Sequence, residues 1–352
     1  MDDAIEFGTL NSLWREYAQR PRTFGYAATT LAEWAEWNAQ LTAKVGDLLG
    51  TMPMTRVALQ PQILEVEELP EYRLEKVAFQ SEAGIHVPCY VLIPRHVNPP
   101  YRAVIALHGH GSGGAAHLLG RTRHAATREQ EIEHIAAHNY DYAHQLACRG
   151  FLVFAPEQRG FGERMETDPG MTFGEAMGRS SCRSLAFNAL LMGRTVLGMR
   201  VWDVMRTLDY IATRPEETRP GVGCVGLSGG GTTTLYATIV EPRITVAVLS
   251  GAFSSFRSSI MSTLHCDCNY LPGILQYVEM ADLAALIAPR PLLIEAGTQD
   301  PIFPVDEVKL ASTQVARVYA LLGMPERFDQ DIFEGGHRFS GKKTFDWFAH
   351  WW

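Results

Sequence analysis

Ser228 lies in "GCVGLSGGG" (223–231), a stretch that surrounds one hydroxyl with five glycines. Glycine and serine together are typical of loops, but here an apolar, strand-like run precedes them and the helix-like "TTTLYATIV" follows. The central "GLSGG" matches G-x-S-x-G, in which the serine occupies a strained turn between a strand and a helix. Side chains at the flanking glycines would collide with that strand and helix. Such a turn exposes a hydroxyl beside a helix N-terminus, where an oxyanion is stabilised, and so indicates nucleophilic acyl chemistry.

A serine hydroxyl is a weak nucleophile unless a base takes its proton, so a base and an orienting acid are expected. His337 in "FEGGHRF" follows the last predicted strand and is the candidate base; a loop histidine that caps a turn is the alternative. Asp300 follows "RPLLIEAGTQ" directly and is the candidate acid, because it lies between Ser228 and His337 in the chain. Glu295 lies within the strand itself, and Asp306 is suited to the first turn of the next helix.

The loops after two other strands carry polar side chains that could support this chemistry. The loop after strand 103–109 should supply an oxyanion donor, and we predict the backbone N–H of His110 there, acting with that of Gly229. The imidazoles of this loop could suggest a metal, but we expect His108 to pack and to order the loop. In "EQRGFGER" we expect Arg159 to be a buried partner of an acid.

Two further groups of residues could suggest a metal site. His134 and His138 stand four residues apart on a helix-like stretch, but the glutamate and third ligand of a zinc enzyme are missing, which favours surface histidines. The segment "HCDCNY" (265–270) contains Cys266 and Cys268, yet a lone C-x-C without a second pair is weak evidence for a metal. We interpret it as a wall of the substrate pocket, and predict no metal and no organic cofactor.

Composition and charge exclude several classes of protein. The chain has 352 residues, of which 46% are hydrophobic and 20% charged, as in soluble globular proteins. A formal charge of −8 provides no basic surface for nucleic acid. No apolar run approaches the roughly 18 residues that a membrane span needs, and "MDDAIEFGTL" lacks the features of a signal peptide. Six scattered cysteines are not a disulfide framework, so we predict a cytoplasmic protein.

The elements that must position these residues are strands alternating with helices from about residue 72 onward. The runs "YRLEKVAFQSE" and "IHVPCYVLIP" predict an antiparallel hairpin, and a helical pattern extends from about Leu185 to Thr213. The alternation predicts an α/β fold, with a mostly parallel sheet covered by helices on both faces and reactive groups at the carboxyl ends of its strands. We predict an N-terminal helical extension (1–70) and one catalytic domain (71–352).

Five segments together, "HGHGSG", "APEQRGFGER", "GLSGGG", "LIAPRPLLIEAGTQDPIFPV" and "FEGGHRF", resemble the α/β-hydrolase superfamily. More narrowly, they are similar to its bacterial dienelactone-hydrolase-like and acetyl-xylan-esterase-like serine esterases, from about residue 72 to the end. The resemblance implies an eight-stranded sheet, a Ser-His-Asp triad and carboxylic ester substrates. It assigns the triad to Ser228, Asp300 and His337, and the oxyanion donors to Gly229 and His110.

The leading hypothesis is a serine carboxylic-ester hydrolase that acts on a small-molecule ester through an acyl-enzyme. The resemblance favours a short acyl group such as acetyl. A peptidase or amidase of the same fold is the second hypothesis, disfavoured because no segment resembles an added propeller domain. A catalytically silent binding protein is the third; loss of a triad residue would favour it, but all three candidates are present. Assembly into a homo-oligomer stays open.

Overall fold

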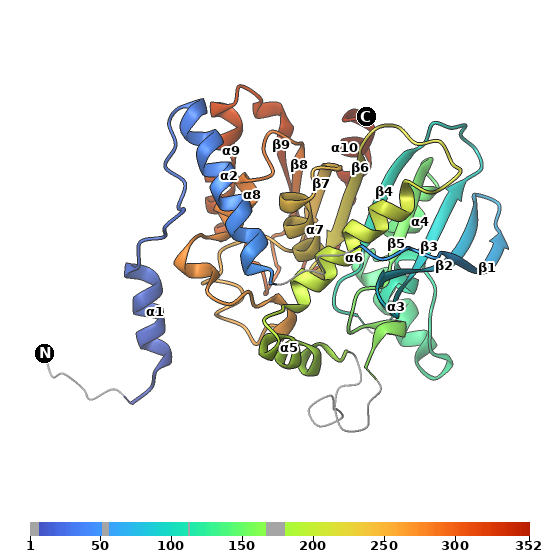
Figure 1. The fold of residues 1–352 in the computed structure, drawn as a ribbon, viewed down its shortest axis with the longest axis horizontal. Coiled ribbons are helices and arrows are strands. Elements are labelled where there is room, and N and C mark those ends of the chain that lie inside the picture. The colour runs from blue at the N-terminus through green and yellow to red at the C-terminus, as the bar shows by residue number, and fades with distance from the viewer. Residues whose placement is uncertain (1–6, 51–55, 112, 167–179) are drawn as a thin grey trace, which may run out of the picture.

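Apolar runs along the chain assemble into one nine-stranded sheet with helices packed against it (Figure 1). The structure is a computed structural model that describes residues 7–50, 56–111, 113–166 and 180–352. In chain order the strands are β1 (Gln62–Glu68), β2 (Tyr72–Glu82), β3 (Ile85–Pro94), β4 (Arg102–Leu107), β5 (Phe151–Pro156), β6 (Val222–Leu227), β7 (Ile244–Ser250), β8 (Leu292–Gly297) and β9 (Phe328–Phe333). Across the sheet the order is β1-β2-β3-β5-β4-β6-β7-β8-β9.

The sheet is antiparallel at one edge and parallel over the rest. Strands β2 and β3 form the predicted antiparallel hairpin, and β3 also pairs antiparallel with β5. From β5 through β4, β6, β7 and β8 to β9 every pairing is parallel. The predicted mostly parallel α/β sheet is confirmed, and the carboxyl ends of β4, β6, β7 and β8 therefore lie along one edge.

The predicted number of eight strands is wrong by one. The additional strand, β1, lies inside the segment 1–70 that was expected to be helical, and it pairs antiparallel with β2. All its residues are exposed, so neither face imposes the alternation of apolar and polar residues that reveals a half-buried strand. The division of the chain near residue 70 remains a prediction.

Helices cover both faces of the sheet (Figure 1). They are α1 (Leu10–Gln19), α2 (Leu31–Leu48), α3 (Arg128–His138), α4 (Tyr142–Ala147), α5 (Cys182–Leu191), α6 (Val196–Ile211), α7 (Gly229–Val240), α8 (Met280–Ala285), α9 (Val305–Leu321) and α10 (Thr344–His350). Among the described helices, none combines the length and the apolar character that crossing a membrane requires.

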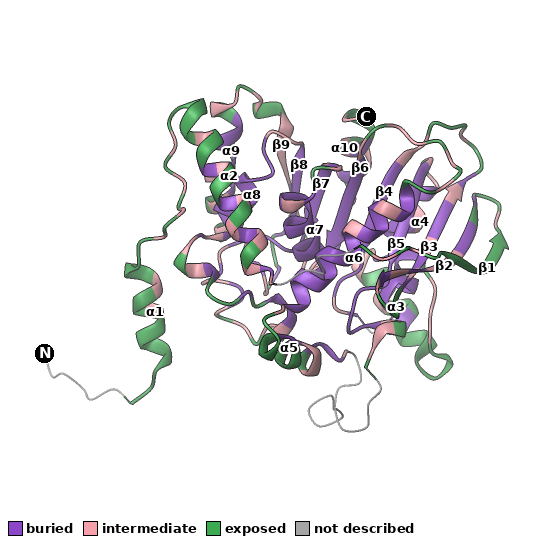
Figure 2. Ribbon diagram, viewed as in Figure 1, coloured by how far each residue is buried: buried purple, intermediate pink, exposed green. Residues whose placement is uncertain are grey.

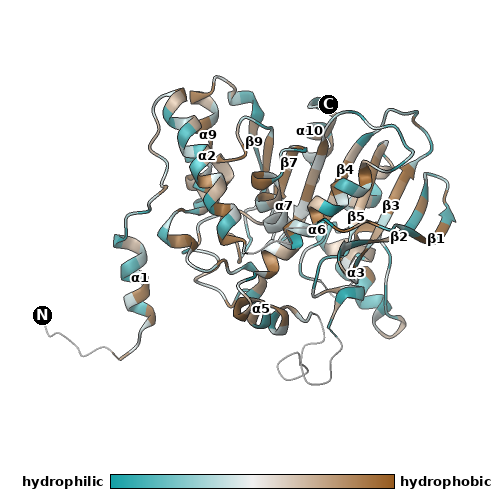
Figure 3. Cartoon of the chain, in the orientation of Figure 1, coloured by the Kyte–Doolittle hydropathy of each residue, from teal (hydrophilic) through white to brown (hydrophobic). Residues whose placement is uncertain are grey.

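The core has two parts because neighbouring residues of a strand point to opposite faces. On β4, Ile105 packs into the core that α2, α6, α7, α8 and α9 share. Its neighbour Val104 packs with α4 and α10. Figures 2 and 3 show the result, with the central strands buried and apolar and the outer surfaces of the helices exposed.

The predicted helix from Leu185 to Thr213 is two helices, α5 and α6. Gly193 has φ +68°, a conformation that a helix interior excludes. Thr195 then caps α6, because its hydroxyl accepts a hydrogen bond from the N–H of Gly198 at 2.9 Å. Apolar residues recur at helical steps on both sides of the break, in α5 and in α6, which is why the sequence did not reveal it.

An ion-pair network on α6 holds the loop that follows β5. Arg159 donates to both carboxylate oxygens of buried Asp203, at 2.8 and 2.9 Å, and Arg164 donates to the same carboxylate at 2.6 Å. Burial raises the pKa of Asp203, but the two guanidinium groups outweigh it and hold that pKa below its usual range. The prediction that Arg159 is a buried partner of an acid is confirmed.

Replacing Asp203 with alanine should lower the free energy of unfolding by about 3–5 kcal/mol, because it removes the buried carboxylate that Arg164 and Arg159 share and leaves only Arg159 with another one, Glu82. Urea unfolding measures this change. Asp306→Ala is the control, since that side chain is 94% exposed on α9 and should cost no more than about 1 kcal/mol. Equal losses in the two variants would contradict the assigned role of Asp203.

Candidate active site

Ser228 forms the predicted turn between strand β6, which ends at Leu227, and helix α7, which begins at Gly229. Its backbone has φ 56° and ψ −121°, a conformation that residues with a side chain rarely adopt. Its N–H donates to the carbonyl of Ser250, at the end of the neighbouring β7, at 2.8 Å. The serine is therefore held at the carboxyl edge of the sheet by a turn of a single residue.

The glycines around Ser228 are a steric requirement of this turn, as predicted. A Cβ atom on Gly226 would lie 2.3 Å from the carbonyl carbon of Gly230. A Cβ atom on Gly230 would lie 2.0 Å from the carbonyl oxygen of Leu107, on β4. Both obstacles are backbone atoms, which cannot move aside as a flexible side chain can.

His337 and Asp300 form a hydrogen-bonded pair. Nδ1 of His337 lies 2.7 Å from Oδ2 of Asp300, whose side chain is only 1% exposed. The other oxygen of Asp300 accepts from the N–H groups of Ile302 and Phe303 at 2.8 and 3.1 Å. The ring of Phe303 stacks on that of His337, with centroids 5.9 Å apart. These contacts fix the plane of the imidazole and leave its Nε2 free of the carboxylate.

The two rival acids have other partners. Glu295 is buried on β8, where it accepts hydrogen bonds from the N–H groups of Ser340 and Gly341 and from the hydroxyl of Thr344, and burial raises its pKa. Asp306 lies exposed in the first turn of α9. Asp300 is therefore the carboxylate that the structure brings to His337.

The serine and the histidine lie next to the same segment of chain. Gly251 directly follows Ser250, which holds the N–H of Ser228, and a Cβ atom on Gly251 would lie 3.1 Å from Cε1 of His337. A pocket of about 240 Å³ opens at the serine. Its lining consists of Ser228, His110, Thr263, Leu264, His265, Cys266 and Ile302. The expectation that the C-x-C segment forms a wall of the pocket is met by Cys266.

The two residues predicted to carry the oxyanion donors are in contact. The N–H of Gly229 belongs to the first turn of α7, where no preceding carbonyl of the helix can accept it. The ring of His110 lies against this glycine: a Cβ atom built on Gly229 would be 2.5 Å from Cε1 of His110. Burial lowers the pKa of His110 to about 4, so the imidazole is neutral near pH 7.

His108 orders the loop, as predicted. It is fully buried, and its Nε2 lies 3.0 Å from both the N–H nitrogen of Gln158 and Oε1 of Glu157. Glu157 in turn accepts from the N–H of Ala115 at 3.0 Å and from Arg123 at 2.9 Å. These contacts join the loops after β4 and β5 into one buried polar network.

Some neighbours of the site were not predicted from the sequence. Phe303 is one, because nothing local distinguishes an apolar residue that stacks on a distant imidazole. His265 lines the pocket, as expected for the segment 265–270, and burial lowers its pKa to about 4. His134 and His138, expected on the surface, are half-buried on α3, with ring centroids 4.1 Å apart.

With this geometry established, comparison with known proteins is informative. Residues 8–335 match the Abhydrolase family. The chain belongs to that family. The match extends over both the N-terminal helices and the sheet, so this Abhydrolase protein is a hydrolase of the α/β-hydrolase fold. Carboxylesterases are among the hydrolases of this fold. The predictions that the chain belongs to the α/β-hydrolase superfamily and is a hydrolytic enzyme are confirmed.

Individual relatives of this Abhydrolase protein are distant in sequence. YtaP of Bacillus subtilis (strain 168), named as a hydrolase, is 24% identical over 311 residues, which cover 86% of this chain and 93% of YtaP. A Bacteroides fragilis NCTC 9343 structure named as an acetyl xylan esterase has a TM-score of 0.78 at 17% identity, covering 95% of this chain and 84% of its own. A glucuronoyl esterase from Solibacter usitatus has a TM-score of 0.68 at 14% identity, and the match covers 95% of this chain and 99% of the esterase.

Gly230→Ala in this Abhydrolase protein should destabilise the fold by about 1–3 kcal/mol or more, because the new methyl group meets the backbone of β4. Gly46→Ala is the matched control: this glycine lies within α2, and a Cβ atom there meets nothing within 4 Å, so the change should be neutral or slightly stabilising. Thermal unfolding of both variants measures the difference. A Gly230→Ala protein as stable as the wild type would refute the close approach of α7 to β4.

Proposed function

We propose that this protein is a serine carboxylesterase that works through an acyl-enzyme, with Ser228 as nucleophile, His337 as base and Asp300 as the orienting acid. The observation that carries the proposal is the 2.7 Å contact between His337 and the buried Asp300, next to the segment that holds Ser228 in its strained turn. A serine at such a turn, a histidine and a carboxylate bound to Nδ1 are the parts that ester hydrolysis needs.

The proposed reaction has two halves. As Oγ of Ser228 attacks the ester carbonyl, Nε2 of His337 takes its proton, and the carboxylate of Asp300 stabilises the imidazolium. The oxyanion accepts hydrogen bonds from the N–H groups of Gly229 and His110. His337 then protonates the leaving alcohol, which leaves the acyl group on the serine. Water, activated by the same histidine, attacks the acyl-enzyme and releases the acid.

We infer that the substrate is a small-molecule ester with a short acyl group. The pocket at Ser228 has a volume of about 240 Å³, small beside the roughly 300–1,000 Å³ of pockets that hold drug-sized ligands. The names of the structural neighbours, an acetyl xylan esterase and a glucuronoyl esterase, also favour esters over amides. The six free cysteines support action in a reducing compartment such as the cytoplasm.

Hydrolysis of p-nitrophenyl esters from acetate to octanoate tests this proposal. The wild type should prefer the short chains, and Ser228→Ala should lose all but a small fraction of kcat/KM. Asp300→Asn should lower kcat by about 10⁴-fold, because it stabilises the wrong imidazole tautomer. Asp306→Asn, the rival acid, should retain full activity.

Four results would count against the proposal. Retained activity in Ser228→Ala would show that Ser228 is not the nucleophile. A loss of activity in Asp306→Asn equal to that in Asp300→Asn would contradict the assignment of Asp300 as the orienting acid. Faster cleavage of p-nitroanilides than of the esters would favour an amidase. A serine that reacts with neither substrates nor a fluorophosphonate probe would favour a binding protein.

A further inference from the structure

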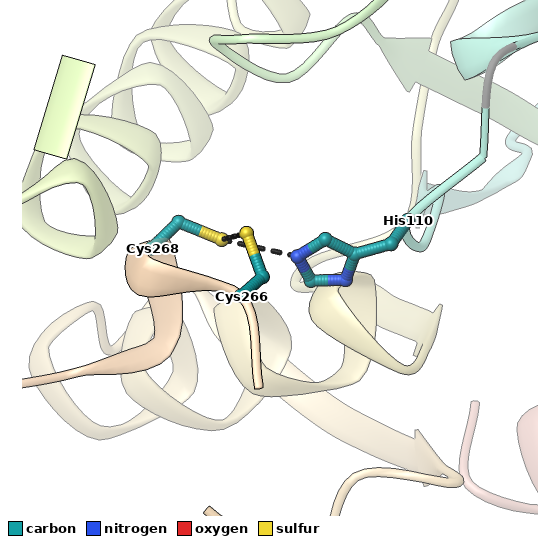
Figure 4. Close-up of side chains that lie close together, drawn as sticks. All are labelled: His110, Cys266 and Cys268. Carbon is teal, nitrogen blue, oxygen red and sulfur yellow. Dashed lines mark hydrogen bonds between the residues drawn. The ribbon is translucent and has the colours of Figure 1, made fainter. Parts of the chain in front are cut away.

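A second group of reactive side chains lies at the wall of the pocket. His110, from the loop after β4, and Cys266 and Cys268, from the segment between β7 and α8, point toward one another (Figure 4). Nε2 of His110 lies 3.0 Å from Sγ of Cys268, and the two sulfur atoms are 3.1 Å apart. One ligand atom from each residue lies within 4.8 Å of the others, close enough to bind one ion.

A buried cation, Arg200, lies against this cluster. Arg200 is 1% exposed and donates to Sγ of Cys268 at 3.2 Å and to Sγ of Cys182 at 3.1 Å. In the described parts of the chain no carboxylate forms an ion pair with Arg200. Its other partners are the carbonyl of Arg159, at 2.7 and 3.2 Å, and the ring of Phe161, so the two cysteine sulfurs are the ionisable groups among its contacts. A buried guanidinium requires such a partner.

The donor atoms of this cluster are of the types that a zinc ion binds. Thiolate sulfur and neutral imidazole nitrogen are the protein donors that bind zinc, whereas magnesium and calcium require oxygen ligands.

We propose that His110, Cys266 and Cys268 form a zinc-binding site at the wall of the Ser228 pocket. Two thiolates and one imidazole are a ligand set used for Zn²⁺, with a fourth position for water or another ligand. His110 and Cys266 both line the pocket, so the ion has a route to the site. The prediction of no metal considered the histidines and the C-x-C segment as separate groups, because Cys268 is 158 residues from His110 along the chain.

Direct binding to the full-length protein tests the site. The protein, reduced and freed of metal, is titrated with Zn²⁺ in competition with a chromophoric chelator and, separately, with Co²⁺ as a spectroscopic probe. We expect one tightly bound equivalent of zinc and, with cobalt, the charge-transfer absorption that thiolate ligands produce. A large excess of Mg²⁺ should not compete.

Single substitutions locate the ligands. Cys266→Ser and His110→Gln should each weaken zinc binding by more than about tenfold. Removing even a residue that only hydrogen-bonds to a metal ligand lowers metal affinity by about that factor, and removing the ligand itself should lower it at least as much. Cys266 is preferred to Cys268 because Cys268 also supports Arg200. Cys148→Ser is the matched control: this half-exposed cysteine lies 3.5 Å from a ring nitrogen of His144, without a second cysteine.

The outcomes separate this site from the proposed esterase chemistry. Ser228→Ala should bind zinc as the wild type does, whatever its effect on hydrolysis. The proposal fails if no saturable equivalent of zinc binds, if Cys266→Ser and His110→Gln bind as tightly as the wild type, or if Cys148→Ser weakens binding as much as they do. Urea unfolding of each variant establishes that it is folded under the conditions of the titration.

Discussion

The single-residue turn at Ser228 is the constraint on which the site depends. A chain that leaves β6 and enters α7 at once forces a positive φ on the serine, and the positions two residues before and after it, Gly226 and Gly230, must then lack side chains. In return, α7 comes so close to β4 that Gly230 lies against the carbonyl of Leu107. The first N–H groups of α7 consequently face the loop after β4, and the carboxyl ends of β4 and β6 are brought to one place.

Buried charge around this turn is balanced in two different ways. Arg159 and Arg164 share the carboxylate of Asp203 and anchor the loop after β5, as ion pairs in a core commonly do. Arg200, one turn before Asp203 on α6, instead contacts the sulfurs of Cys182 and Cys268 and the carbonyl of Arg159. Sulfur is soft and polarisable, so the wall of the pocket beside Arg200 has a chemistry that the carboxylate network lacks.

Membership of the Abhydrolase family and low identity to its relatives are compatible for a physical reason. At 17% identity the Bacteroides fragilis structure still has a TM-score of 0.78, because a fold depends on which positions are apolar more than on which apolar residue fills them. The residues that line the pocket are under no such constraint. The fold therefore transfers between relatives, whereas the substrate has to be argued from the pocket itself.

The sequence by itself determined what short-range spacing controls. Alternating strands and helices predicted the sheet and its two covered faces, and "GLSGG" predicted the turn at Ser228, because both depend on neighbouring residues. Tertiary structure alone decided three things: the exposed edge strand β1, the break between α5 and α6, and the meeting of His110 with Cys266 and Cys268. The exposed strand β1 has no alternation of apolar and polar residues, and the apolar period runs on across the break between α5 and α6. The cluster joins segments far apart in the chain, whose contact depends on how the whole sheet is assembled.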